Sequence, residues 1–332
     1  MMKTVKPFIK WVGGKSQLLE QIEGFFPDEL KKEQVKHYVE PFLGSGAMFF
    51  SLFEKYKIKS AHLSDINKDL ILAYIIVQQK PEFLLDFLKQ FQDEYDSTIQ
   101  EKRNEFFLSV REHFNRQRFE INYNKISENW IPRAAQFIFL NKTCFNGLFR
   151  LNSKGEYNVP YGKYKTAAIL DEENILAVSN ALQNVTITQS KYADCYHKIS
   201  QNTFVYFDPP YRPITQTSNF TSYTGNDFCD KQQLELAAFF RELDQKKGAK
   251  LMLSNSDPKN INPDDNFFEK AYKGYNISKI SASRAVNCKG NKRGKINELL
   301  ITNYRIPKPV DCLRRTAGSE TNTLPKQDPL GC

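Results

Sequence analysis

An Asp-Pro-Pro-Tyr run at residues 208–211 is the stretch of this sequence best placed to do chemistry. It follows four apolar or aromatic residues, 204–207, that indicate a short buried strand. Proline lacks a backbone N–H and fixes φ, so the strand must end at Pro209. An acid, a rigid turn and an aromatic ring then stand at the carboxyl end of a strand, where open α/β sheets bind ligands. The alternative is a strand-ending turn with a solvated Asp208 and a packing Tyr211.

The first of two glycine-containing turns lies near the amino terminus. Gly13 and Gly14 permit a tight turn with close backbone approach to a ligand, and Lys15 begins a helical pattern. A helix start that carries a lysine can bind an anion. The spacing is not that of a Walker A loop, because the second Gly-Lys-Ser/Thr element is missing. An ordinary loop-to-helix turn is the alternative.

The second turn has the geometry that a nucleoside ligand needs. A strand from residue 37 ends at Pro41, and a Gly-x-Gly turn at residues 44–46 leads into a helix. The next strand ends at Asp65, which could accept hydrogen bonds from ribose hydroxyls or cap the following helix. The third glycine of a dinucleotide fingerprint is absent, and Glu40 precedes the turn. This pattern argues against NAD and favours a nucleoside without pyrophosphate, such as S-adenosylmethionine.

The motifs together resemble those of the Dam-type DNA adenine-N6 methyltransferases, the D12 class, in the family order and over residues 7–304. Four motifs carry the resemblance: Phe8-x-Lys10-Trp11-x-Gly13-Gly14-Lys15, Glu40-Pro41-Phe42-x-Gly44-x-Gly46, Asp65-Ile66-Asn67 and Asp208-Pro209-Pro210-Tyr211. Residues 219–223 resemble the loop that follows the last motif. Four motifs in order are much more specific than any one of them.

The resemblance implies a cofactor and the residues that bind it. S-adenosylmethionine is the expected methyl donor, S-adenosylhomocysteine the product, and no metal is expected. The cofactor-binding residues that match the family motifs are Trp11, Lys15, Glu40, Phe42, Gly44, Gly46, Asp65 and Asp208. The catalytic residues that match are Asp208, Pro209 and Tyr211.

These residue types suit direct methyl transfer to an exocyclic amine. Adenine N6 is a poor nucleophile because its lone pair is conjugated with the ring. Hydrogen bonds from N6 to the Asp208 carboxylate and the Pro209 carbonyl would draw the amine toward tetrahedral geometry. Tyr211 would stack on the base after its extrusion from the duplex. Positioning then carries most of the catalysis, and the chain has no Pro-Cys dipeptide of the kind that cytosine-C5 methyltransferases use.

A hairpin-like loop at residues 144–165 is the candidate reader of the DNA sequence. It carries asparagine, which suits adenine, and arginine, which suits guanine. It also resembles the recognition hairpin of the GATC-specific group, which implies DNA contacts by Lys10, Phe145, Asn146, Leu148, Arg150, Pro160 and Tyr164. Lys292, in a basic glycine-containing loop, is expected to meet phosphate. The alternatives are a structural hairpin and a solvated loop.

The elements that must position these residues indicate an α/β protein. The expected fold is the Rossmann-like S-adenosylmethionine-dependent methyltransferase fold with an inserted, mainly helical DNA-recognition domain. The catalytic domain spans residues 1–76 and 171–305, and the recognition domain spans 77–170. Further expected elements are helices at 132–140, 173–182 and 192–199, strands at 185–187 and 250–254, a terminal hairpin of 275–280 with 298–304, and a helix capped by Asp230 with Gln233. Residues 212–228 are expected to be a mobile loop, and 306–332 a disordered tail.

Composition fits this interpretation. The chain has 332 residues, 40% hydrophobic and 26% charged, as in a soluble protein with a large core. Its net charge of +9 favours an anionic partner, and double-stranded DNA is the one we expect. The six cysteines and four histidines lack metal-ligand spacing, so neither a metal site nor a disulfide framework is expected. With no signal peptide and no apolar run long enough for a bilayer, a cytoplasmic location is expected. The protein is also expected to be a monomer.

Three other functions stay open at this point. A cytosine-N4 DNA methyltransferase shares the chemistry but more often has serine in place of Asp208. In RNA and protein-glutamine methyltransferases the tetrad usually begins with asparagine. A catalytically silent DNA-binding protein would have no need of the complete tetrad. For the favoured function, restriction-modification, mismatch-repair marking and phage protection all fit the sequence.

Overall fold

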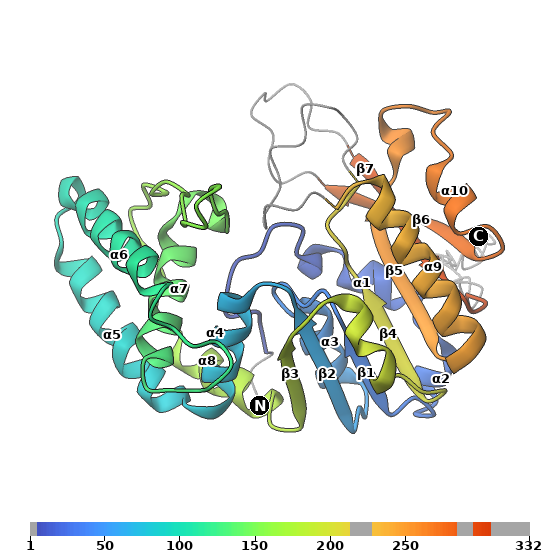
Figure 1. The fold of residues 1–332 in the computed structure, drawn as a ribbon, viewed down its shortest axis with the longest axis horizontal. Coiled ribbons are helices and arrows are strands. Elements are labelled where there is room, and N and C mark those ends of the chain that lie inside the picture. The colour runs from blue at the N-terminus through green and yellow to red at the C-terminus, as the bar shows by residue number, and fades with distance from the viewer. Residues whose placement is uncertain (1–4, 213–227, 284–294, 307–332) are drawn as a thin grey trace, which may run out of the picture.

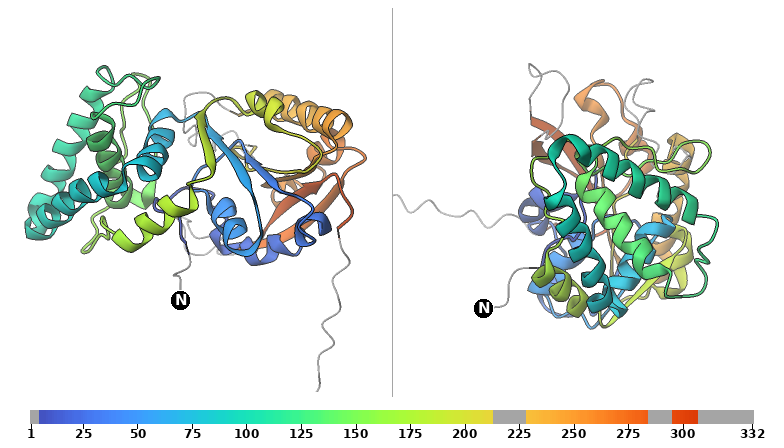
Figure 2. Two further views of the ribbon diagram at one scale, coloured as in Figure 1. Left: turned by 90° about the horizontal axis from the view of Figure 1, so that it is seen from below. Right: turned by 90° about the vertical axis from the view of Figure 1, so that its left-hand side faces the viewer.

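The computed structural model describes residues 5–212, 228–283 and 295–306 (Figure 1). Two parts lie side by side: a sheet flanked by helices, and a group of helices beyond one edge of that sheet (Figures 1 and 2). The expected loop motif at 219–223, Lys292 and the expected tail from 307 onward lie outside the described residues.

Among the described residues the sheet has seven strands in the order β3-β2-β1-β4-β5-β7-β6. The strands are β1 (His37–Glu40), β2 (Ser60–Asp65), β3 (Val185–Gln189), β4 (Thr203–Phe207), β5 (Lys250–Ser256), β6 (Asn276–Ser283) and β7 (Lys295–Thr302). The first five in this spatial order are parallel, and β7 runs antiparallel to both β5 and β6. The expected α/β fold and the terminal hairpin are therefore confirmed.

Helices connect the strands and form the second part. They are α1 (Leu19–Glu23), α2 (Asp28–Lys31), α3 (Ala47–Lys55), α4 (Lys68–Gln79), α5 (Pro81–Ser97), α6 (Arg103–Gln117), α7 (Trp130–Thr143), α8 (Glu172–Ala181), α9 (Asp230–Lys247) and α10 (Phe267–Ala271). Short 3-10 turns cover Lys15–Gln17, Gln100–Lys102, Phe145–Gly147, Tyr192–Lys198 and Pro258–Asn260. The helical segment expected at 192–199 is thus a 3-10 turn.

The central strand β4 shows why the sequence places the sheet here. All of its residues are buried, as expected for a parallel strand covered on both faces. Phe204 and Tyr206 pack into the core on one face, with side chains from α1 and α3. Val205 and Phe207 pack into the core on the other face, with α9. This alternation follows from the two-residue period of a strand and leaves the residue after Phe207 at the sheet edge.

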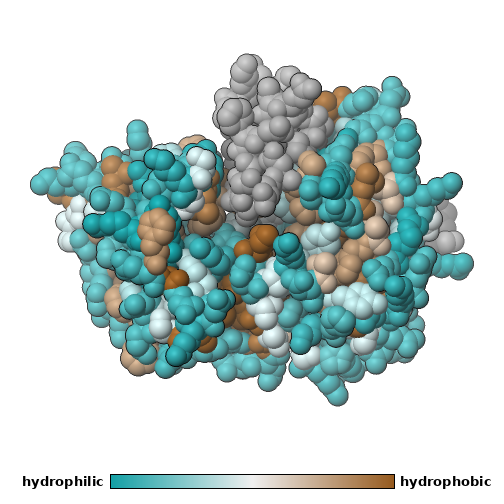
Figure 3. All heavy atoms as spheres, in the orientation of Figure 1, coloured by the Kyte–Doolittle hydropathy of each residue, from teal (hydrophilic) through white to brown (hydrophobic). Residues whose placement is uncertain are grey.

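The helical part consists of α5, α6 and α7, and α4 joins it to the sheet. The exposed apolar side chains of this part are scattered, as in Phe83, Ile99 and Phe119, and the surface seen in Figure 3 is mostly hydrophilic. α7 begins two residues earlier and ends three later than expected. The expected boundary between residues 76 and 77 falls in the last turn of α4.

Two helix starts differ from the sequence expectation. The cap of α9 is Cys229, whose backbone N–H donates to Gln232 Oε1 at 3.2 Å. The capping pair is therefore Cys229 with Gln232, one position before the expected pair of Asp230 with Gln233. Gln233 is instead buried. Cysteine is not among the usual N-cap residues, so the sequence signal favoured the aspartate that follows it. At α4 the cap is Asn67, which accepts from the N–H groups of the first turn.

A buried ion pair holds α4 against the helical part. Arg133 of α7 is 1% exposed, and its Nε donates to Asp69 Oδ1 of α4 at 2.9 Å. The Tyr123 hydroxyl donates to the same carboxylate oxygen at 2.6 Å, and the guanidinium lies 3.7 Å from the centre of the Phe114 ring. The cation is therefore desolvated by the contacts that fix the two helices together.

The Asp69→Ala substitution should lower the free energy of unfolding by about 3–5 kcal/mol, because it leaves the Arg133 guanidinium buried without its counter-ion. Urea denaturation followed by circular dichroism measures this change. Glu242→Ala, which removes the partner of Lys246 in an exposed ion pair, is the control and should have little effect. A loss no larger than that of the control would show that the Asp69 pair does not hold the two parts together.

Candidate active site

The carboxyl ends of β1, β2 and β4 lie together along the side of the sheet where the parallel strands end. We call this side the edge. His37 at the start of β1 is level with Ser60 of β2 and with Thr203 of β4. Because the strands are parallel and neighbours, their last residues meet at the same edge. These ends carry Glu40 of β1, Asp65 of β2 and, directly after β4, the Asp-Pro-Pro-Tyr tetrad.

Asp208, the first residue of the tetrad, is fixed by a cation and a hydroxyl. Its carboxylate lies 2.8 Å from Lys15 Nζ, and Ser254 Oγ donates to Asp208 Oδ1 at 2.8 Å. Lys15 is only 3% exposed and also donates to the carbonyl of Gly13 at 2.8 Å. Ser254 is oriented by the hydroxyl of Tyr206, 2.9 Å away. The amino-terminal turn and the strand end, far apart in sequence, thus form one charged pair.

Tyr211, the last residue of the tetrad, is held at the face of its ring and at its hydroxyl. Lys15 Nζ lies 4.7 Å from the ring centre, and the phenol donates to Glu298 Oε2 of β7 at 2.6 Å. Burial, followed by the Asp208 and Glu298 carboxylates, raises the pKa of the Tyr211 phenol, so it remains a proton donor. Burial likewise raises the pKa of Glu298, although Lys15 and the phenol oppose this. The ring orientation is therefore set by the protein.

The Gly-x-Gly turn requires glycine at both positions. Gly44 has φ +48°, and a Cβ there would lie 2.8 Å from Trp11 Cδ1. Gly46 has φ +68°, and a Cβ there would lie 2.7 Å from the Tyr74 hydroxyl. Left-handed backbone and close neighbours both exclude a side chain. The expected cofactor residues Trp11, Gly44 and Gly46 are therefore brought together at this turn.

Asp65 connects the tip of β2 to that turn. Its Oδ2 accepts from the N–H of Gly44 at 3.1 Å, and its Oδ1 accepts from the N–H of Asn67 at 2.9 Å. Burial raises the pKa of Asp65, and these hydrogen bonds oppose the shift. The alternative role of Asp65 as the cap of the next helix is wrong, because Asn67 is the cap.

Glu40 and Phe42 lie deeper than the sequence suggested. Glu40 is 2% exposed and accepts from the Tyr38 hydroxyl at 2.8 Å. Burial raises the pKa of Glu40 well above its usual range, and the nearby Asp208 charge adds to the shift. Phe42 is partly buried and stacks on Tyr192 at 5.5 Å between ring centres. Glu40 therefore lies beneath the edge rather than on its surface.

The edge fits a nucleoside cofactor because it combines a glycine turn with a hydrogen-bond acceptor. Glycine at both positions leaves the turn without side chains of its own, and Trp11 and Tyr74 pack where they would project. The Asp65 carboxylate beside the turn is a hydrogen-bond acceptor of the kind that ribose hydroxyls need. Two exposed apolar residues adjoin the residues that contact the turn: Val12, next to Trp11, is 45% exposed, and Ile66, next to Asp65, is 49% exposed. In the part of the chain that the structure describes, no three His, Cys, Asp or Glu residues form a metal-binding group.

The expected recognition hairpin is joined to the amino-terminal segment by Asn141. The Asn141 side chain accepts from the backbone N–H of Lys10 and donates to its carbonyl, both at 2.8 Å. It also donates to the carbonyl of Gly147 in the hairpin at 3.1 Å. Gly147 has φ +62°, and a Cβ there would lie 2.3 Å from Lys10 Cβ. No local sequence pattern marks Asn141, because its role depends on contacts between distant segments.

Three of the expected DNA-binding residues contact one another. Lys10 Nζ lies 4.5 Å from the centre of the Tyr164 ring, and the Tyr164 hydroxyl accepts from the N–H of Asn146 at 3.2 Å. Asn146 is exposed and has φ 55°, a left-handed conformation that asparagine tolerates better than most residues. Lys10, Asn146 and Tyr164 thus form one polar group, in which Lys10 and Asn146 are exposed and Tyr164 is partly buried.

The remaining expected DNA-binding residues flank this group. Phe145 is 50% exposed, and its N–H donates to the carbonyl of Pro160 at 2.9 Å. Leu148 and Arg150 are partly buried. Arg150 Nε donates to Asn158 Oδ1 at 2.8 Å, so the hairpin itself orients the guanidinium.

Among the described residues, no helix is long and apolar enough to span a membrane.

Comparison with known proteins gives a consistent result. The family described as D12 class N6 adenine-specific DNA methyltransferase matches residues 11–286. The Type II methyltransferase M.MjaIII of Methanocaldococcus jannaschii is 51% identical over 301 residues, which cover 90% of this chain and 99% of that protein. The Type II methyltransferase M1.LlaDCHI of Lactococcus lactis subsp. cremoris is 38% identical, with 90% and 96% covered. A DNA adenine methylase of Vibrio cholerae is 31% identical, also with 90% and 96% covered.

Proposed function

This chain belongs to the D12 class of N6 adenine-specific DNA methyltransferases, and we propose that it methylates adenine in duplex GATC after flipping the base from the helix. The adenine-specific methyltransferase activity follows from the family; the target sequence, the base flipping and the residue roles are our proposal. The observation that carries it is the meeting of Lys15, Asp208 and Tyr211 at the strand ends. There an oriented acceptor and an aromatic ring lie beside a turn suited to a nucleoside.

Bound S-adenosylmethionine would supply the methyl group as an activated sulfonium. We assign the ribose hydroxyls to Asp65, which already accepts hydrogen bonds at the glycine turn. The glycines at 44 and 46 put no side chain of the turn in the way of the nucleoside, and Trp11 packs where a side chain of residue 44 would project. The other residues that we expect to hold the cofactor are Trp11, Lys15, Glu40, Phe42 and Asp208.

Asp208 and Pro209 would accept hydrogen bonds from the two N6 hydrogens of the target adenine. A carboxylate offers about four lone-pair positions, so contacts with Lys15 and Ser254 leave Asp208 able to accept a further bond. These contacts also orient the acceptor before the base arrives, which lowers the reorganisation needed in the transition state. Tyr211 supplies the ring on which the flipped base stacks.

The hairpin of residues 144–165 would read the duplex, with Lys10 contributing from the amino-terminal segment. We assign guanine to Arg150. Arg150 Nε donates to the Asn158 side chain at 2.8 Å, whereas Arg150 Nη2 lies 3.5 Å from the Asn158 carbonyl. The two Nη groups could therefore donate end-on to guanine O6 and N7. We propose that residues 77–170 form the recognition domain. Lys292, which we assign to phosphate, lies outside the described residues.

The Asp208→Ala variant should have no detectable methyl transfer, because the target amine loses its charged acceptor. The test incubates protein with labelled S-adenosylmethionine and duplex DNA, and mass spectrometry identifies the modified base. Asp86→Ala, which removes an exposed aspartate of α5, should transfer at the wild-type rate. Near wild-type methylation by Asp208→Ala would make the catalytic assignment wrong, and N4-methylcytosine as product would identify the cytosine-specific alternative.

The Asp65→Ala variant should bind S-adenosylmethionine about 1–3 kcal/mol more weakly, the scale of losing hydrogen bonds to a charged group. Isothermal titration calorimetry measures the affinity, and the melting temperature shows whether the turn is still folded. An unchanged affinity would leave Asp65 with only a structural role, that of fixing the backbone of Gly44 and Asn67.

The Arg150→Ala variant should lose about 1–3 kcal/mol of binding to GATC and discriminate less at one base pair. Lys292→Ala is the contrast. This substitution should weaken binding to all DNA sequences about equally and reduce the salt dependence of binding. Treated plasmid is digested with nucleases that do or do not cut N6-methylated GATC, and binding is titrated on cognate and altered duplexes. Modification confined to another sequence would refute the GATC assignment, and an equal loss on all duplexes would place Arg150 on the DNA backbone.

A further inference from the structure

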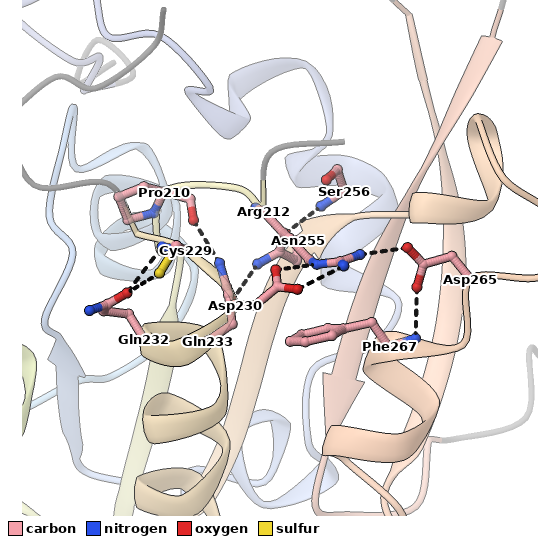
Figure 4. A network of polar contacts seen from close by, with 10 residues as sticks. All are labelled: Pro210, Arg212, Cys229, Asp230, Gln232, Gln233, Asn255, Ser256, Asp265 and Phe267. Carbon is pink, nitrogen blue, oxygen red and sulfur yellow. Dashed lines mark hydrogen bonds and ion pairs between the residues drawn. The ribbon is translucent and has the colours of Figure 1, made fainter. Parts of the chain in front are cut away.

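The backbone on both sides of Tyr211 is held by two buried amide side chains that lie outside the tetrad. Gln233 Nε2 of α9 donates to the carbonyl of Pro210 at 3.0 Å (Figure 4). Asn255 Nδ2 of β5 donates to Gln233 Oε1 at 3.2 Å, and Asn255 Oδ1 accepts from the N–H of Arg212 at 3.2 Å. Both amides are 0% exposed. The carbonyl before Tyr211 and the N–H after it are thus linked through one hydrogen-bonded chain.

The direction of hydrogen-bond donation along this network is set by the backbone groups at its two ends. The carbonyl of Pro210 requires a donor, and the N–H of Arg212 requires an acceptor. Two uncharged side chains in series satisfy both ends when each donates on one side and accepts on the other. Among side chains of suitable length, the amides of Gln233 and Asn255 do this without charge, whereas a carboxylate in either position could not donate. Buried polar groups are costly when unpaired, so this arrangement specifies one backbone conformation.

The two amides are placed by elements that already serve the site. Asn255 directly follows Ser254, the residue that orients the Asp208 carboxylate. The chain leaving Tyr211 is fixed as well, because the Arg212 guanidinium pairs with Asp230 and Asp265 at 2.6 Å each and lies over the Phe267 ring (Figure 4).

We propose that Gln233 and Asn255 are positioning residues for methyl transfer: they fix the Tyr211 backbone so that its ring is in place before the target base arrives. This inference rests on the proposed function and adds the residues that preorganise its stacking platform. A ring free to shift by about 1 Å would present the base poorly to the methyl donor, an error that can cost about 100-fold in rate. Neither amide is expected to touch substrate, so both act through the tetrad.

The first test measures the single-turnover methylation rate of Gln233→Leu and Asn255→Asp on a GATC duplex. Each variant removes the donor from one link: leucine cannot donate to the Pro210 carbonyl, and aspartate cannot donate to Gln233. The rate should fall about 10- to 100-fold, while the affinities for S-adenosylmethionine and DNA stay at their wild-type values. Asn174→Leu, which removes a buried amide of α8 outside this network and outside the proposed recognition domain, is the matched control and should retain the wild-type rate.

The second test combines Gln233→Leu with Asn255→Asp. Residues in one hydrogen-bonded chain couple, so the double variant should be no slower than the slower single variant. Wild-type rates in the singles, or rate losses matched by losses of melting temperature and of cofactor affinity, would overturn the proposal in favour of a structural role. A wild-type protein that methylates no adenine would instead refute the proposed function.

Discussion

The buried ion pair between Lys15 and Asp208 is the constraint on which the site depends. Lys15 is almost fully enclosed, so its ammonium must be neutralised where it lies, and the carboxylate at the end of β4 does this at 2.8 Å. The pair draws the amino-terminal turn across the strand ends and places the ammonium against the Tyr211 ring. The packing of Trp11 on Gly44 and the hydrogen bonds of Asn141 to Lys10 hold the same amino-terminal segment.

The sheet supplies the other half of the arrangement. Parallel strands end at one edge, and this places Glu40, Asp65 and Asp208 as neighbours even though long stretches of chain separate them. The antiparallel strand β7 then returns to the same edge and contributes Glu298, the acceptor for the Tyr211 hydroxyl. Both types of strand pairing are therefore used, one to gather the acids and the other to orient the ring.

The sequence predicted the parts that carry a local signal. The strand before Asp208, the turn at residues 44–46 and the terminal hairpin could be read from apolar runs, prolines and glycines, since those residue types restrict the backbone directly. Ser254, Gln233 and Asn255 could not be read in this way. Each is a polar residue in a strand or helix, and its partner is set only when the elements pack. The one-residue error in the cap of α9 has a similar cause, because Cys229 has no capping preference of its own.

The three hydrogen bonds made by Asn141 imply that the hairpin is not an interchangeable module. They join Lys10 to Gly147, and Lys10 lies only five residues before Lys15. A transplanted hairpin fits against Lys10 only if it too has glycine at position 147, where even a methyl group would lie 2.3 Å from Lys10 Cβ. Under the proposed function, a change of target sequence in this scaffold therefore calls for exchange of the amino-terminal segment together with the hairpin.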